Sequence, residues 1–269
     1  MDKPMTAMNK PMIAVAALVV VAAAGAWYYL QQRPAPQTPA AAPEAPIAAS
    51  APPETAIEHP APVSQGASLA PLPSLNDSDS PLRDALADVA GPAAVAQYLV
   101  PENLIRRIVV TVDNLPRQKV PAAKRPVIGI PGSFLAQGDE EHPTVDPRNF
   151  ERYKAAVGVL GKLDAQRLAA AYLRFYPLFQ QAYEDLGYPK GYFNDRLVQA
   201  IDSLLATPEH AGAIELARPN VMYTFADPAL EARPAGQKLL LRMGPENAAI
   251  VKAKLRELRT AVTAQAPRR

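Results

Sequence analysis

The sequence contains no cysteine at all. That absence excludes disulfides, thiolate nucleophiles, iron–sulfur clusters and cysteine-based zinc sites. Histidine is scarce too, with three residues in 269, and no HExxH motif accompanies them. Charge of neither sign dominates, because 28 Lys and Arg face 26 Asp and Glu, a balance too even for a nucleic-acid-binding surface. We therefore expect no cofactor, no metal and no nucleic-acid partner.

Long apolar runs are also rare, and the one present lies near the N-terminus. Residues 12–30, MIAVAALVVVAAAGAWYYL, carry no charge, and at about 1.5 Å per residue they reach across a hydrocarbon core of roughly 30 Å. Lys3 and Lys10 precede this run and Arg33 alone follows closely, which places the N-terminus in the cytoplasm. The sequence predicts a cytoplasmic tail over 1–11, a transmembrane signal anchor over 12–30, and a single-pass inner-membrane protein whose C-terminal domain is periplasmic.

A cleaved signal peptide is the alternative to this anchor. Ile13–Ala26 is long enough for the apolar region of a signal peptide, and Ala24–Ala26 resembles an A-x-A cleavage site. The apolar run continues past that site into Trp27–Tyr29, aromatic residues that are typical of a membrane interface and favour the anchor. Both interpretations export the rest of the chain.

Proline is concentrated after the apolar run. Eleven of the thirty prolines lie between Pro34 and Pro73, among Ala, Ser, Thr, Gln and Glu that cannot form a core to offset the entropy of ordering. We predict a disordered Pro/Ala-rich linker over 31–74. In a polyproline II conformation, at about 3.1 Å per residue, it would act as an arm of up to roughly 120 Å; the alternative is a spacer without preferred length.

Residues 75–263 are predicted to form one mainly α-helical domain, followed by a basic tail over 264–269. Apolar residues recur at helical spacing between Pro, Gly and Asp boundaries. A β-branched run after Leu104 also fits a strand, but its apolar face favours a helix. Glycines in 127–145 predict a small hairpin that contains 134–137, and 221–225 alternate as a short strand. The predicted helices cover 81–90, 92–99, 104–112, 147–160, 164–186, 193–206, 235–243 and 245–262.

Three stretches resemble a known family. They are TVDNLPR at 111–117, RFYPLFQQAYEDLGYPKGYFNDRL at 174–197 and GQKLLLRMGPENAAIVKAKLRELR at 236–259. They resemble a bacterial membrane-anchored family carried as the domain of unknown function 3014, and the resemblance covers the folded region. An anchor followed by a proline-rich arm is similar to the layout of that family. The resemblance implies no activity, ligand or catalytic residue.

The stretch LGYPKGYFNDR, residues 186–196, connects two predicted helices and is the best candidate for a site. Gly187 suits a helix C-terminus with positive φ, Pro189 cannot continue a helix, and Gly191 permits entry into the next one. A turn therefore accounts for the glycines and the proline. It does not account for two tyrosines and the Asn-Asp-Arg run that follows them.

Two interpretations of those remaining residues stay open. Asn194 and Asp195 can favour a helix start while Arg196 pairs with a nearby carboxylate. Alternatively, Tyr188, Tyr192, Asn194 and Arg196 form a surface that stacks on a sugar ring or a peptide, as aromatic and Arg side chains do at interfaces. An envelope protein or peptidoglycan would be the partner of such a surface.

Catalytic patterns are weak, and we predict no catalytic residue. Ser133, His142 and Asp146 have the residue types of a hydrolase triad, but GIPGSFL is not a nucleophile elbow. The charged residues 139–142, DEEH, fit a solvated turn better than a metal site. Neither of the pairs Glu184/Asp185 and Asp195/Asp202 has the facing geometry of glycosidase carboxylates. The sequence favours a membrane-tethered periplasmic interaction or scaffolding domain; the alternative is a cell-envelope hydrolase acting on peptidoglycan or other wall material.

Overall fold

Helices dominate the folded region, as predicted, in the computed structural model, which describes residues 57–62, 71–210, 212–219 and 222–264. The α-helices are α2 (Asp79–Ala90), α3 (Pro92–Tyr98), α4 (Leu104–Asn114), α5 (Arg148–Lys162), α6 (Ala165–Asp185), α7 (Phe193–Leu205), α8 (Pro228–Glu231), α9 (Ala235–Met243) and α10 (Pro245–Thr263). The shorter elements are the 3-10 turns η1 (Leu75–Asp77) and η2 (Ala122–Lys124) and the strands β1 (Ala136–Gln137), β2 (Thr144–Val145), β3 (Leu216–Ala217) and β4 (Thr224–Phe225).

Local sequence signals explain most helix boundaries. The Asp164 and Asp227 side chains accept the N–H groups of Arg167 and Ala229, and so begin α6 and α8. The run after Leu104 is helical, so the strand alternative is wrong there. The prediction for α2 was two residues late, because the helix begins at Asp79 rather than at Pro81.

Two short hairpins complete the fold. β1 pairs antiparallel with β2, which confirms the predicted hairpin. β4 confirms the strand predicted at 221–225, but its partner β3 was not predicted. Three alternating residues at 221, 223 and 225 indicated β4, whereas the stretch around β3 offers only two, Ile214 and Leu216. Two residues are too few to be recognised as an alternating strand, so only the folded chain reveals that partner.

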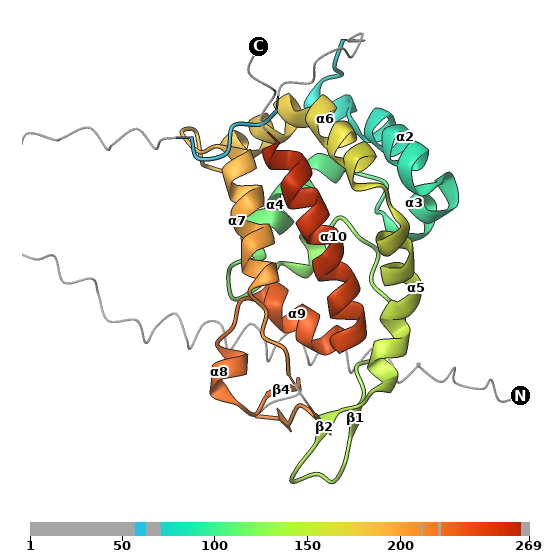
Figure 1. Cartoon of the computed structure of the whole chain (residues 1–269), viewed down its shortest axis with the longest axis vertical. Helices are drawn as coiled ribbons and strands as arrows, with labels where there is room; N and C mark the ends of the chain where they lie inside the picture. The colour runs from blue at the N-terminus through green and yellow to red at the C-terminus, as the bar shows by residue number, and fades with distance from the viewer. Residues whose placement is uncertain (1–56, 63–70, 211, 220–221, 265–269) are drawn as a thin grey trace, which may run out of the picture. The chain divides into compact units, whose positions relative to one another are not determined.

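The helices pack around α10, which lies against α5, α6 and α7 (Figure 1). On the other side, α4 packs against α6 and α7, while α2 packs against α3 and α6. The largest apolar cluster joins α2, α4, α6 and α7. Its most deeply buried side chains are Leu104, Val109, Phe175 and Phe193. The two hairpins and α8 lie together at one end of these helices (Figure 1).

The connection between α6 and α7 contains the predicted turn. Gly187 follows the C-cap residue Leu186 and has φ +113°, so the positive φ expected from the sequence is confirmed. Gly191 serves close packing instead, because a Cβ at that position would stand 2.8 Å from the Tyr183 ring. Gln180 of α6 holds the same segment, since its side chain donates to Gly191 O at 2.8 Å and accepts from Phe193 N–H at 2.9 Å.

Replacing Gly187 with valine should lower the free energy of unfolding by about 1 kcal/mol or more, because a β-branched residue is strained at positive φ. No atom lies within 4 Å of the added Cβ, so strain rather than collision is the cause. Gly158→Ala, within α5 and equally open, is the matched control and should stabilise by about 0.5 to 1 kcal/mol. Urea unfolding measures both. A neutral Gly187→Val would contradict the assigned backbone conformation.

No helix among the described residues is both long and apolar enough to cross a membrane. The predicted tail over 1–11, the predicted anchor over 12–30, most of the linker over 31–74 and nearly all of the basic tail over 264–269 lie outside the described residues. Residues 57–62 fall within the predicted linker and are described, and they contact the helical domain.

Candidate functional site

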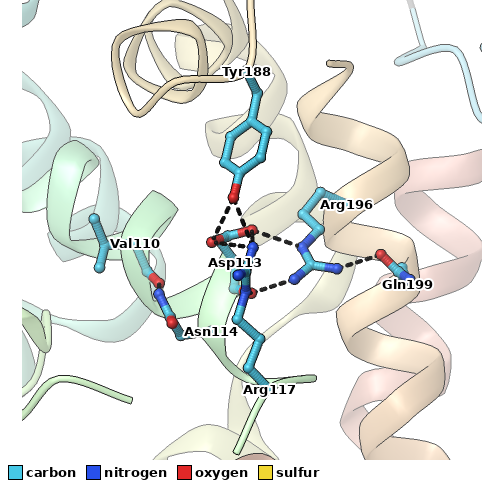
Figure 2. Close-up of polar contacts among 7 residues, drawn as sticks. All are labelled: Val110, Asp113, Asn114, Arg117, Tyr188, Arg196 and Gln199. Carbon is cyan, nitrogen blue, oxygen red and sulfur yellow. Dashed lines mark hydrogen bonds and ion pairs between the residues drawn. The ribbon is translucent and has the colours of Figure 1, made fainter. Parts of the chain in front are cut away.

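A buried ion pair between α4 and α7 joins two of the stretches that carry the family resemblance. The Arg196 Nε donates to Asp113 Oδ1 at 3.0 Å, and its Nη2 donates to the Asp113 main-chain carbonyl (Figure 2). The two side chains are 14% and 6% exposed. Charges this far from water are stabilised by such direct bonds rather than by solvent. The pair therefore fixes the first turn of α7 against the last turn of α4.

Two further residues complete the bonding of the Asp113 carboxylate. Arg117, one helical turn beyond Asp113, places Nη2 3.0 Å from Oδ2, and the hydrogen bond raises the pKa of its guanidinium. The Tyr188 hydroxyl accepts from Arg117 at 2.7 Å and lies 3.4 Å from Asp113 Oδ2 (Figure 2). The Tyr188 ring also stacks on Tyr183, with 4.6 Å between centroids. These contacts tie the loop before α7 to α4.

A different set of side chains beside this cluster holds a distant segment of the chain. We call Tyr192, Asn194 and Asp195 the α7 clamp. Asp195 accepts the N–H groups of Glu58 and His59, at 3.2 and 2.6 Å. The Asn194 amide donates to His59 O at 2.9 Å, and the Tyr192 hydroxyl accepts from Ala61 N–H at 2.9 Å. Residues 57–62, the blue segment beside the start of α7, thus lie on the clamp (Figure 1).

Buried contacts hold the clamp in place. Asn194 is fully buried; its amide also donates to Val262 O in α10 at 3.1 Å, while its carbonyl accepts from the Tyr172 hydroxyl at 3.0 Å. The Tyr192 ring packs against the Tyr176 ring, with 5.8 Å between ring centroids. Burial raises the pKa of both Tyr172 and Tyr176. These two phenols therefore stay neutral at physiological pH, and Tyr172 remains a hydrogen-bond donor to the clamp.

Comparison with known proteins assigns the family. A family model described as "Protein of unknown function (DUF3014)" matches residues 104–259, more than half of the chain. The chain belongs to the DUF3014 family. No curated protein and no solved structure matches it. The matched region of this DUF3014 chain contains the buried ion pair and the α7 clamp, and it begins after residues 57–62.

The structure divides the four contact residues predicted from the sequence. The polar atoms of Tyr188 and Arg196 both point to the buried Asp113 carboxylate (Figure 2). The other two, Tyr192 and Asn194, contact residues 57–62. Whether these side chains bind a partner stays a prediction.

Sequence reasoning missed two residues of this region. Asp113 was not singled out, although a carboxylate partner for Arg196 was one of the open interpretations. The sequence predicted that Asp195 favours a helix start. No side-chain cap bond begins α7, however, and the Asp195 carboxylate accepts main-chain N–H groups 136 and 137 residues away. An acidic residue in a first turn fits either role, so the sequence contained no signal for the second one.

The residues of the conceivable triad do not meet among the described parts of the chain. Three hydrogen bonds from Arg148, two of 2.8 Å and one of 2.5 Å, engage the Asp146 carboxylate and lower its pKa. His142 lies beside Asp139 on an exposed turn, with 3.4 Å between His142 Nδ1 and Asp139 Oδ1. Among the described residues, Ser133 makes no hydrogen bond with His142 or Asp146. No group of three potential metal ligands occurs there either.

A cleft in the described part of the DUF3014 domain has a volume of about 660 Å³. It lies between the β1–β2 hairpin and the start of α10, away from the α7 clamp, and most of its lining is apolar. Its carboxylates are Glu209 and Glu246, both exposed. A general acid for glycoside cleavage is typically a desolvated carboxyl group, so neither residue has the environment of one. Asp195 and Asp202 do not form a carboxylate pair, because Asp202 is bonded to Arg259 at 2.6 Å.

Proposed function

We propose that this DUF3014 protein is a non-enzymatic interaction domain tethered to the inner membrane by residues 12–30, with its helical domain in the periplasm and an envelope protein or peptidoglycan as its partner. The uncharged N-terminal run and its flanking lysines support the tether. One structural observation supports the interaction. The α7 clamp makes four side-chain bonds to the main chain of Glu58, His59 and Ala61. A surface that bonds to main-chain N–H and carbonyl groups has the chemistry of a peptide-binding site.

The hydrolase alternative has no comparable support. The described cleft residues include exposed carboxylates, and the acidic groups nearest the α7 clamp are bonded to Arg196 or to residues 58 and 59. Retaining and inverting glycosidases alike require two carboxyl groups that face one scissile bond. The arrangement around the α7 clamp instead supports binding.

The cysteine-free chain allows one residue to report both location and contact. We expect Lys190→Cys, on the exposed loop before α7, to react in intact cells with a maleimide that passes the outer but not the inner membrane. We further expect a crosslinker at the same thiol to join the chain to one discrete envelope component. Gel shift and mass spectrometry measure the two results.

Glu140→Cys is the matched control, because it lies on the exposed β1–β2 hairpin and has no contact with the α7 clamp. It should be labelled equally but give no crosslinked product. Protection of both thiols until cells are lysed would overturn the periplasmic location. Labelling of both with identical crosslinked products would overturn the proposal that the loop and the clamp form the contact surface.

A further inference from the structure

We propose that the α7 clamp is a binding site for a short, proline-containing peptide of a partner protein, and that residues 57–62 occupy this site in the free chain. This inference rests on the proposed interaction function and specifies the chemistry of the partner. It follows from three observations: which atoms of the segment are held, which are left exposed, and how firmly the clamp is built.

The clamp contacts the main chain of the segment. Between residues 58 and 61 three N–H groups exist, and Glu58, His59 and Ala61 each donate theirs to Asp195 or Tyr192. Residue 60 is proline and has no N–H to donate. One carbonyl, that of His59, accepts from Asn194. Any peptide with N–H groups at the first, second and fourth positions can make the same bonds.

Half of the residues in the segment are exposed. Ile57 is 55% exposed and Glu58 and Pro60 are exposed as well, whereas His59, Ala61 and Pro62 are half-buried. No side chain between 57 and 62 donates or accepts a hydrogen bond with the described domain. A main-chain hydrogen bond contributes a net stabilisation of about 1 kcal/mol. Four such bonds hold the segment reversibly, and nothing in them is specific to this sequence.

Proline defines the kind of peptide that fits. Pro60 stands at the one position of this stretch where no N–H is needed, and Pro62 follows two residues later. Proline fixes φ near −65° and so reduces the entropy lost on binding. A partner peptide of the pattern x-x-Pro-x therefore matches the bonding pattern of the clamp.

The clamp is rigid enough to exist without its occupant. Asn194 is held by bonds to Tyr172 and Val262 that do not involve the segment. Tyr192 packs against Tyr176, and the backbone that carries all three clamp residues is fixed by the buried pair of Asp113 and Arg196. A site organised in advance loses less entropy on binding, which favours exchange of one occupant for another.

The test uses the full-length chain and a fluorescent peptide, TAIEHPAPVS, with the sequence of residues 55–64. His59→Pro combined with Ala61→Pro removes two N–H donors from the chain's own segment and leaves the domain unchanged. The variant should bind the peptide about tenfold more tightly than the wild type, because a tethered competitor acts at an effective concentration on the order of 1 mM. Fluorescence polarisation measures both affinities.

Domain-side substitutions locate the binding. In the chain that carries His59→Pro and Ala61→Pro, adding Tyr192→Phe and Asp195→Asn should weaken peptide binding at least tenfold, because three of the four bonds lose their acceptor or its charge. Asp185→Asn, an exposed acid on α6, is the matched control and should have no effect. A peptide with proline in place of His59 and Ala61 should not bind. Far-UV circular dichroism verifies that every variant remains folded.

Three results would overturn the inference: equal affinity of the wild type and the His59→Pro/Ala61→Pro chain, no binding by either up to millimolar peptide, or binding that survives the Tyr192→Phe/Asp195→Asn changes. The proposed function is tested separately by crosslinking at Lys190→Cys. A crosslinked partner without peptide binding would leave the interaction domain intact and reject the proline-peptide specificity. Peptide binding without export would support the proline-peptide specificity and reject the proposed periplasmic interaction domain.

Discussion

Replacing Arg196 with alanine is expected to lower the free energy of unfolding by about 3 kcal/mol, because removal of one partner leaves a buried charge without its main counterion. The stranded group is the Asp113 carboxylate, 6% exposed and bonded to the Arg196 Nε at 3.0 Å. Arg117 remains nearby, but half of its side chain is exposed, so it compensates incompletely. Urea unfolding of the purified chain measures the loss.

Arg117→Ala is the control for this prediction. It removes a guanidinium from the same carboxylate, but an exposed one, and should cost about 1 kcal/mol or less. Removing both buried charges with Asp113→Ala and Arg196→Ala should cost less than the sum of the two single changes, since each single change strands the other group. Equal losses for Arg196→Ala and Arg117→Ala would show that the α4–α7 pair is not the dominant contact.

Phe193→Ala is expected to destabilise the domain by about 3 to 5 kcal/mol, the range for truncation of a large buried aromatic side chain. Phe193 is 1% exposed, stacks on Phe179 at a 5.7 Å centroid distance, and also contacts Tyr172 and Tyr183. Alanine would leave a cavity that these rings can fill only in part. Thermal and urea unfolding, followed by circular dichroism, measure the change.

The adjacent residue provides the comparison. Tyr192→Ala should cost about 1 kcal/mol, because it loses one hydrogen bond and a half-buried ring contact. Phe193→Leu should cost less than about 1.5 kcal/mol, because most of the buried volume is kept. If Tyr192→Ala were as damaging as Phe193→Ala, the tyrosine would be a core residue and its assignment to a binding surface would be wrong.

The local part of the fold could be predicted from the sequence. Pro, Gly and Asp boundaries together with helical spacing identified the starts of α7, α9 and α10, and Gly187 identified the turn after α6. These features depend on backbone geometry and hydrogen bonds within a few residues of each other. Strand β3 was missed because its alternating pattern is short. The start of α2 was placed too late because adjacent residues carry similar helix-start signals.

The site could be predicted only in part, for the same physical reason. Aromatic and charged residues marked the loop at 186–196, but residue type does not reveal which side chains turn inward. Arg196 pairs with Asp113, 83 residues away in the chain, whereas Asp195, its neighbour, turns toward residues 58 and 59. Successive residues on a helix point about 100° apart, so the packing of α7 decides which of them is buried.

The sequence by itself determined the helical class of the domain, the apolar N-terminal run, the absence of cysteine chemistry and the position of the turn before α7. The tertiary structure alone decided that a buried carboxylate on α4 receives Arg196, and that part of the proline-rich segment lies on the α7 clamp. The division has a physical cause. Periodicity and capping act between near neighbours in the chain, whereas ion pairs and peptide contacts depend on distances in space that only the packed helices establish.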